Sequence, residues 1–492
     1  MTRDRQRRTA AAATARALLV AGAMLGAVGT ATVAAAQETT TRRGDAPTSD
    51  RQPPTSVASA RRIPKIAFEK YTLPNGLEVI LHEDHSTPVV AVNTWYHVGS
   101  GDEQRGRTGF AHLFEHIMFM GSQNVPTGKF DEWLESAGGN NNGSTTNDRT
   151  NYYEWLPANA LPLALWLDAD RMGFLLPTMD SAKVDLQRDV VKNERRERVD
   201  NVPYGRADET ISAALFPASH PYSWPVIGSM TDLSAASIED VKNFFRTYYA
   251  PNNATLVIAG DFQPADAKRL VEKYFGPIPR GPRAITRPTP PAFTVPRDTF
   301  LLLEDRVQLP RVFYAWHSVR IFDKDDAPLD VLAYVLAGDK NSRLYKKLVY
   351  ELQVAQDVNA GQRSMNLDGE FQVDVTPKPN ESPAKIDSLT RIEIRKVIDG
   401  GVTQRELERA QNTIRAQALD RIASVLGKSD QLNFYNYFAG TPDFVQQDEA
   451  RYDAVTAADV QRVARTYLGA HKVVLTVVPQ GKKEMMVMGG GQ

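Results

Sequence analysis

The sequence of 492 residues contains no cysteine. Disulfide bonds and thiolate metal ligands are therefore excluded, so a bound metal would need histidine, aspartate or glutamate side chains. Long apolar runs are also missing, because no segment after residue 36 has about 18 consecutive apolar residues, the length that spans a membrane. The formal net charge is only −1, which gives no indication of a basic face for nucleic acid.

Residues 1–36 differ from the rest of the chain. Five arginines precede a weakly polar run, residues 17–36, which ends in Ala34-Ala35-Ala36. This order is typical of a secretory signal peptide with small residues at its cleavage site; an Arg-rich organelle transit peptide is the alternative. Cleavage would remove the five arginines and Asp4 and leave a net charge of −5. We expect export across the inner membrane of a Gram-negative bacterium, into the periplasm.

Proline marks the expected divisions of the remaining chain. Residues 37–62 are polar and interrupted by proline, which predicts a disordered lead-in. Seven prolines within 277–296 divide the chain near its middle. We predict a catalytic domain over 63–279, a Pro-rich linker over 280–298, a second domain over 299–481 and a mobile tail over 482–492.

Strand and helix patterns recur in the same order in both halves. The Asn75-Gly76 turn between apolar residues predicts a hairpin. Further strands are expected over 88–98, 256–261, 300–303 and 311–317, and helices over 266–275, 328–336 and 343–352. Residues 248–260 also resemble residues 467–479, so each half ends in a similar strand. We therefore predict an α+β protein of two duplicated domains, each an antiparallel-rich sheet packed with helices.

The segment His112-Leu-Phe-Glu115-His116 carries the chemistry. Thr108 can cap a helix that ends at Gly121, and residues one turn apart on such a helix project from the same face. Two imidazoles at this spacing supply two of the three protein ligands of a catalytic zinc. Glu115 would lie beside the metal, where its carboxylate can take a proton from water. The pattern is the inverse of His-Glu-x-x-His and predicts a zinc peptidase.

A third protein ligand must come from elsewhere in the chain. The predicted helix 181–199 offers Asp189, Glu194 and Glu197, and composition does not choose among them.

The second half cannot repeat the metal site. Counting back from Gly338 places Leu329, Leu332 and Ala333 where the first half has its two histidines and its glutamate. We expect the second domain to be an inactive wall or lid for the substrate.

These residues resemble the pitrilysin family of zinc peptidases, which includes insulin-degrading enzyme, mitochondrial processing peptidase and short secreted bacterial members. The resemblance extends from Leu73-Pro-Asn-Gly-Leu77 through Val98-Gly-Ser-Gly-Asp-Glu103 to the second half. It implies half of a clamshell chamber and one Zn²⁺ per chain. Val190-Val-Lys-Asn-Glu194 matches the family's downstream segment and makes Glu194 the implied third ligand.

The resemblance also implies a strand for the substrate. Residues 138–145, followed by Asp148-Arg-Thr150-Asn-Tyr152, resemble the edge strand on which the family holds extended peptides through main-chain hydrogen bonds. Asn142 occupies the family's asparagine position, and Gly143 replaces the usual alanine.

Two departures from the family pattern concern the support of the site. Gln187 stands where the family has a carboxylate that supports the metal, so no negative charge is added there. Val349 and Gln356 stand where members that act alone have an arginine and a tyrosine that bind substrate and stabilise the oxyanion. Nearby Arg343 and Tyr345 do not have that spacing. We expect a second, homologous subunit to supply the missing pair in a hetero-oligomer.

The sequence thus predicts a secreted zinc endopeptidase or oligopeptidase that hydrolyses extended peptides, with Glu115 as general base. The competing hypothesis is a metal-binding assembly subunit with little turnover unless a partner is present.

Overall fold

The computed structural model describes residues 62–282 and 284–489. The expected signal peptide, almost all of the expected lead-in and the end of the expected tail lie outside these residues. The strands are β1 (Glu69–Thr72), β2 (Glu78–Glu83), β3 (Val89–Tyr96), β4 (Asn140–Thr145), β5 (Thr150–Pro157), β6 (Ala254–Gly260), β7 (Thr299–Asp305), β8 (Arg311–Ser318), β9 (Ala355–Ser364), β10 (Gly369–Pro377) and β11 (Val473–Pro479).

The α-helices are α2 (Phe110–Ile117), α3 (Lys129–Ser136), α4 (Leu161–Phe174), α5 (Ser181–Arg195), α6 (Ala207–Leu215), α7 (Met230–Ala235), α8 (Ile238–Tyr248), α9 (Pro264–Phe275), α10 (Asp326–Ala337), α11 (Pro383–Gly400), α12 (Gln404–Arg421), α13 (Val425–Phe438), α14 (Val445–Asp453) and α15 (Ala457–Val463). A π-helical turn, η4 (Arg196–Asp200), continues α5, and another, η7 (Tyr345–Glu351), precedes β9. The strands and helices expected from the sequence are therefore confirmed, with shifted ends.

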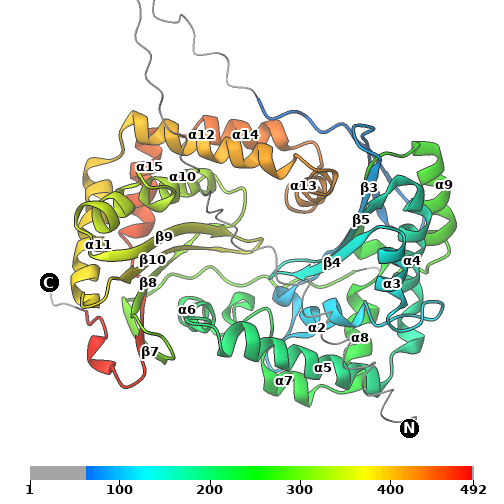
Figure 1. Cartoon of the computed structure of the whole chain (residues 1–492), viewed down its shortest axis with the longest axis horizontal. Helices are drawn as coiled ribbons and strands as arrows, with labels where there is room; N and C mark the ends of the chain where they lie inside the picture. Colours follow the sequence, from blue (N-terminus) through cyan, green and yellow to red (C-terminus); the bar gives the residue numbers. More distant parts are fainter. Residues whose placement is uncertain (1–61, 283, 490–492) are drawn as a thin grey trace, which may run out of the picture. The chain divides into compact units, whose positions relative to one another are not determined.

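Two sheets of matching topology form the framework (Figure 1). The first has the order β1-β2-β6-β3-β5-β4 and the second the order β7-β11-β8-β10-β9. In each sheet the last strand of the half pairs in parallel with an early strand, and the other pairings in the shared five-strand order are antiparallel. The predicted α+β duplication is thus confirmed, with β1 as an additional strand of the first sheet.

Each half supplies a helix that covers a sheet of the other half. Helix α13 places Leu432 and Tyr435 against Ile80 and Val257 of the first sheet. Its Asn433 amide also donates to a backbone oxygen of β3 at 3.0 Å. Helix α6 packs its apolar side chains against β8 and β11 of the second sheet. Because each buried leucine side chain stabilises by about 2 kcal/mol, this exchange joins residues from Ile63 onward into one compact unit.

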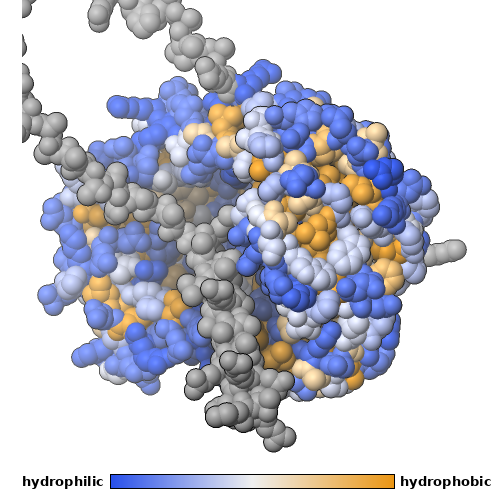
Figure 2. All heavy atoms as spheres, turned by 45° about the vertical axis from the view of Figure 1, so that its right-hand side comes forward, coloured by the Kyte–Doolittle hydropathy of each residue, from blue (hydrophilic) through white to orange (hydrophobic). Residues whose placement is uncertain are grey.

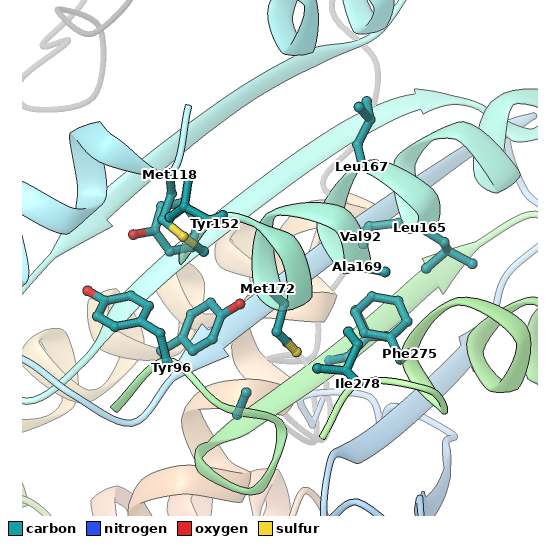
Figure 3. Packing of buried hydrophobic residues seen from close by; sticks show 14 of the residues in the cluster. Val92, Tyr96, Met118, Tyr152, Leu165, Leu167, Ala169, Met172, Phe275 and Ile278 are labelled. Atoms are coloured by element: carbon teal, nitrogen blue, oxygen red, sulfur yellow. The ribbon is translucent and has the colours of Figure 1, made fainter. Parts of the chain in front are cut away.

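The opposite face of the first sheet carries the larger core. Helices α3, α4 and α9 lie along this side in Figure 1. Figure 3 shows Leu165 and Met172 of α4 on the side of Phe275, the last residue of α9, and of Ile278, which follows α9. Helix α2 enters the same core through its apolar residues, so its opposite, polar face is free to carry the histidines.

The start of α2 differs from the expected threonine cap. Thr108 instead donates its hydroxyl to Asp232 at 2.8 Å. Gly109, at φ +91°, precedes the helix, and the Glu103 carboxylate accepts the N–H groups of Gly109 and Ala111 at 2.8 and 2.9 Å. A carboxylate satisfies these free donors and the positive end of the helix better than a hydroxyl does. Burial raises the pKa of Glu103 to about 8, against the lowering effect of these hydrogen bonds.

The described part of the expected C-terminal tail contacts the second core. The described part of this tail reaches residue 489, and Val487 within it is 1% exposed. The Val487 N–H donates to the Thr476 hydroxyl on β11 at 3.0 Å. Val487 thus adds an apolar side chain of this segment to the second core.

The helices of the described residues include no candidate for a membrane span. None of their helices combines the length and the hydropathy that a crossing requires. On the face turned forward in Figure 2, hydrophobic residues lie in separate spots among hydrophilic ones.

The approach of two glycines at the start of α2 gives a test of the fold. A Cβ on Gly228, at φ +76°, would lie 2.3 Å from the Cα of Gly109, whereas a Cβ on Gly106, at φ +83°, would meet nothing within 4 Å. We expect Gly228→Ala to lower the free energy of unfolding by about 3 kcal/mol or more, because backbone must move. Gly106→Ala should cost only about 1 kcal/mol, the strain of the left-handed conformation.

Denaturant unfolding of both variants measures this difference. Equal destabilisation by the two substitutions would contradict the close approach of Gly228 to Gly109.

Candidate metal centre

Helix α2 presents His112 and His116 toward one carboxylate. The rings lie 4.9 Å apart between centroids. The Nε2 atoms of His112 and His116 are 3.5 and 3.0 Å from Oε2 of Glu194. One ligand atom from each of these residues lies within 4.8 Å of the other two. The structure therefore brings together the two motif histidines and the third ligand implied by the family resemblance.

The structure distinguishes the three carboxylates that the sequence left as alternative third ligands. Glu194 lies one residue before the end of α5, which packs beside α2. Its side chain is only 12% exposed. Asp189 is 76% exposed and faces Lys192, and Glu197 is exposed on the following π turn. Only Glu194 of the three faces the histidines.

The second carboxylate oxygen of Glu194 has its own partner. Arg198 on η4 approaches Oε1 of Glu194 with its Nη1 at 2.6 Å. This contact turns Oε2 toward the imidazoles and leaves Oε2 as the oxygen that can bind a metal ion. No sequence signal distinguished Arg198 from the other arginines of this charged segment.

The surroundings of the buried Glu194 carboxylate show whether a metal ion fits this site. Oε2 of Glu194 is buried and has no hydrogen-bond partner among the described residues. It faces two imidazole nitrogens across a short gap, as the donors of a tetrahedral divalent ion do. Two nitrogens and one oxygen are suitable donors for zinc and leave one coordination position for water or substrate. The residues present therefore fit the implied zinc ion.

The protonation of these groups also favours metal binding. Burial lowers the pKa of His112, which keeps the imidazole neutral and able to donate its lone pair. Although burial acts to raise it, the pKa of Glu194 is lowered to about 2, chiefly by the His116 imidazole 3.0 Å from its oxygen and by the nearby His112.

Glu115 lies beside the cluster and contacts β4. Its Oε2 accepts the Thr145 hydroxyl at 2.6 Å. A Cβ on Gly143 would lie 3.1 Å from its Cγ, so the side chain runs along one face of this strand. Sequence reasoning did not single out Thr145. The catalytic candidate therefore stands between the metal ligands and the expected substrate strand.

Strand β4 has the position that strand addition requires. It ends the first sheet, pairs only with β5 among the described strands, and leaves its other edge without a strand. Asn142 lies on it and is partly buried. Its Oδ1 accepts the N–H of Gly143 at 2.8 Å.

Gln187 does not support a ligand through a hydrogen bond. Its side chain is buried on α5 and donates to the sulfur of Met120 at 2.9 Å. Nδ1 of His112 is buried and has no hydrogen-bond partner in the described structure.

The positions expected to carry an arginine and a tyrosine lie in the second half. Val349, on η7, packs against the second core, and Gln356, on β9, is exposed. Arg343 makes two hydrogen bonds to the Glu406 carboxylate, at 2.8 and 2.9 Å, and is engaged there. Tyr345 packs against the same core as Val349.

A polar cavity of about 600 Å³ adjoins the centre at Arg198. It extends to the faces of β9 and β10, and Arg363 and Glu370 are among its lining residues. No sequence pattern indicates this cavity, because its walls come from both halves.

Two known protein families match this chain. The family described as Insulinase (Peptidase family M16) matches residues 78–221, which contain helix α2 with its two histidines and strand β4. The family described as Peptidase M16 inactive domain matches residues 235–414. This chain belongs to peptidase family M16. The resemblance to pitrilysin-type zinc peptidases is thereby confirmed.

Curated relatives of this M16 chain span most of its length. "Zinc protease PqqE" of Helicobacter pylori is 29% identical over 420 residues, covering 84% of this chain and 92% of the relative. "Probable mitochondrial-processing peptidase subunit beta, mitochondrial" of Arabidopsis thaliana is 25% identical, covering 83% of this chain and 77% of the relative.

A solved structure shares the fold. The crystal structure of a protease from Helicobacter pylori superimposes with a TM-score of 0.77 at 26% identity, covering 84% of this chain and all of that one.

The zinc affinities of two glutamate variants test the ligand set. We expect Glu194→Gln to weaken zinc binding more than about 100-fold, because an amide oxygen carries no charge and binds zinc poorly. Glu197→Gln, on the adjoining turn, should leave the affinity unchanged. Competition with a chromogenic chelator gives both affinities. Equal affinity of Glu194→Gln and the wild type would exclude Glu194 as a ligand.

Proposed function

We propose that this chain is a zinc-dependent endopeptidase or oligopeptidase that hydrolyses peptide bonds of extended peptides. The observation that carries the proposal is the convergence of His112, His116 and Glu194, with Glu115 between them and a free sheet edge. A closed structural zinc site would not require Glu115 at that place.

His112, His116 and Glu194 would hold the zinc ion. When bound, zinc polarises the scissile carbonyl and lowers the pKa of water. The Glu115 carboxylate takes the proton of the attacking water and delivers it to the leaving nitrogen, as a general base and then a general acid. Partial burial of Glu115 beside β4 limits the directions from which water reaches it.

Substrate would join β4 as an additional strand. Main-chain N–H and C=O groups at the free edge bind a peptide in extended conformation, largely independently of its side chains. Asn142 on this strand would add a side-chain contact. This geometry favours peptides and unfolded segments over folded proteins.

A homologous second subunit would complete the oxyanion site. Two observations favour it: Val349 and Gln356 cannot donate as an arginine and a tyrosine do, and Arg343 is already paired with Glu406. The name of the Arabidopsis relative describes a subunit, which agrees with a hetero-oligomer. The same observations support the second candidate function, a metal-binding assembly subunit that turns over little until paired.

We also propose that the mature chain acts in the periplasm after removal of residues 1–36. The arrangement of arginines and small residues in this segment supports the proposal.

The general base gives the first test of the activity. We expect Glu115→Gln to keep its zinc and to lose about a thousandfold in kcat, because an amide does not accept the proton. Glu132→Gln on α3 is a matched change at an exposed glutamate and should leave activity intact. Peptide hydrolysis and zinc content are measured on each protein. Wild-type activity in Glu115→Gln would remove this residue from the mechanism.

The partner requirement is tested by reconstitution. Addition of a homologous subunit that carries the arginine and the tyrosine should raise kcat per zinc by about 100- to 1000-fold, the contribution of oxyanion donors. Turnover is measured for each subunit alone and for the mixture. A homodimer of this chain with full activity would contradict the requirement.

A further inference from the structure

The side chain of Glu115 rests on one face of β4. Residues 143 and 145 lie on the same face of a strand, because side chains alternate. Gly143 leaves room for the Glu115 stem, since a Cβ there would come within 3.1 Å of Cγ. Thr145, two residues on, donates its hydroxyl to the carboxylate at 2.6 Å. One residue thus receives the stem and the other holds the charged end.

The Thr145 hydroxyl has a single proton, and Oε2 of Glu115 accepts it. The other oxygen, Oε1, then remains for the proton of the attacking water. A glutamate beside two metal ligands could otherwise turn toward the metal and occupy its open position. The hydrogen bond holds the carboxylate on the strand, and Glu115 is not part of the converging ligand group.

Hydrogen bonds at the turn between β4 and β5 fix the hairpin on which Thr145 lies. Thr145 pairs with Thr150, and the N–H of Thr146 donates to the Arg149 carbonyl at 2.9 Å. The Arg149 guanidinium donates to the Ser144 carbonyl at 2.8 Å. The position of the hydroxyl is therefore set by the hairpin and not by α2.

We infer that Thr145 is a positioning residue that links the substrate strand to the general base. This inference rests on the proposed peptidase function. A peptide that pairs with the free edge of β4 straightens and orders this strand. Because the Thr145 hydroxyl is hydrogen-bonded to Glu115, the Glu115 carboxylate becomes ordered together with the strand. Binding at the edge and readiness for proton transfer are thus set by the same strand.

Substitution of the hydroxyl separates this role from a structural one. Thr145→Val keeps the β-branched shape that suits a strand and removes only the hydrogen bond. We expect kcat to fall about 10- to 100-fold, the usual effect of a misplaced catalytic group. KM and zinc content should stay within about twofold of the wild type, because neither depends on the hydroxyl. Thr145→Ser retains the hydroxyl and should restore most of kcat.

Thr94→Val is the matched control. Thr94, on β3 of the same sheet, donates its hydroxyl to the Asp168 carboxylate at 2.7 Å, and neither residue belongs to the site. This variant should lose thermal stability and keep the kcat of the folded enzyme. A wild-type kcat in Thr145→Val, a loss confined to KM, or no rescue by serine would each overturn the inference.

A crystal structure of zinc-loaded Thr145→Val tests the inference without turnover. The Glu115 carboxylate should leave β4 and move toward the metal ligands. An unchanged carboxylate would overturn the inference. If zinc-loaded wild type fails to cleave peptides with its partner present, the proposed function fails, and the position of Glu115 in this variant still decides the role of Thr145.

Discussion

The approach of α2 to α5 is the constraint on which the site depends. It brings Oε2 of Glu194 within 3.5 Å of both imidazole nitrogens, although the helices α3 and α4 and the β4–β5 hairpin separate α2 from α5 in the chain. The apolar face of α2 in the first core and the Glu103 carboxylate at its start fix one side of this approach. Arg198 fixes the other by holding the second oxygen of Glu194. A buried carboxylate oxygen without a hydrogen-bond partner is costly, so the arrangement is one that a bound cation would stabilise.

Duplication gives the two halves one topology and two roles. At the positions that carry His112, Glu115 and His116 in α2, α10 has Leu329, Leu332 and Ala333, all buried in the second core. The second half keeps its stability by filling this region with apolar side chains in place of a metal site. It also covers the first sheet with α13, while α6 of the first half covers the second sheet. The second half is thus part of the framework that holds the candidate metal centre.

Strand β4, the proposed substrate strand, and Glu115, the proposed general base, are in direct contact. Strand β4 offers a free edge on one side and contacts Glu115 through Thr145 on its face. Gly143, which departs from the family's alanine, lets the Glu115 stem approach closely. At the two positions where the family resemblance implies oxyanion donors, Val349 packs against the second core and Gln356 is exposed. This pair of residues is the physical reason for the proposed partner subunit.

The sequence by itself determined the local features: the helix of His112 and His116, the Asn75-Gly76 hairpin, and the repeated order of strands, because periodicity and turn residues act over a few positions. From spacing alone it left Asp189, Glu194 and Glu197 open, and only the family resemblance pointed to Glu194. It also gave Thr108 as the cap of α2 and residues 482–492 as a tail. The tertiary structure alone decided that Glu103 takes the cap, that Val487 is buried, and that Thr145 meets Glu115. These contacts join residues far apart in the chain, and their energies depend on packing and burial that no local pattern records.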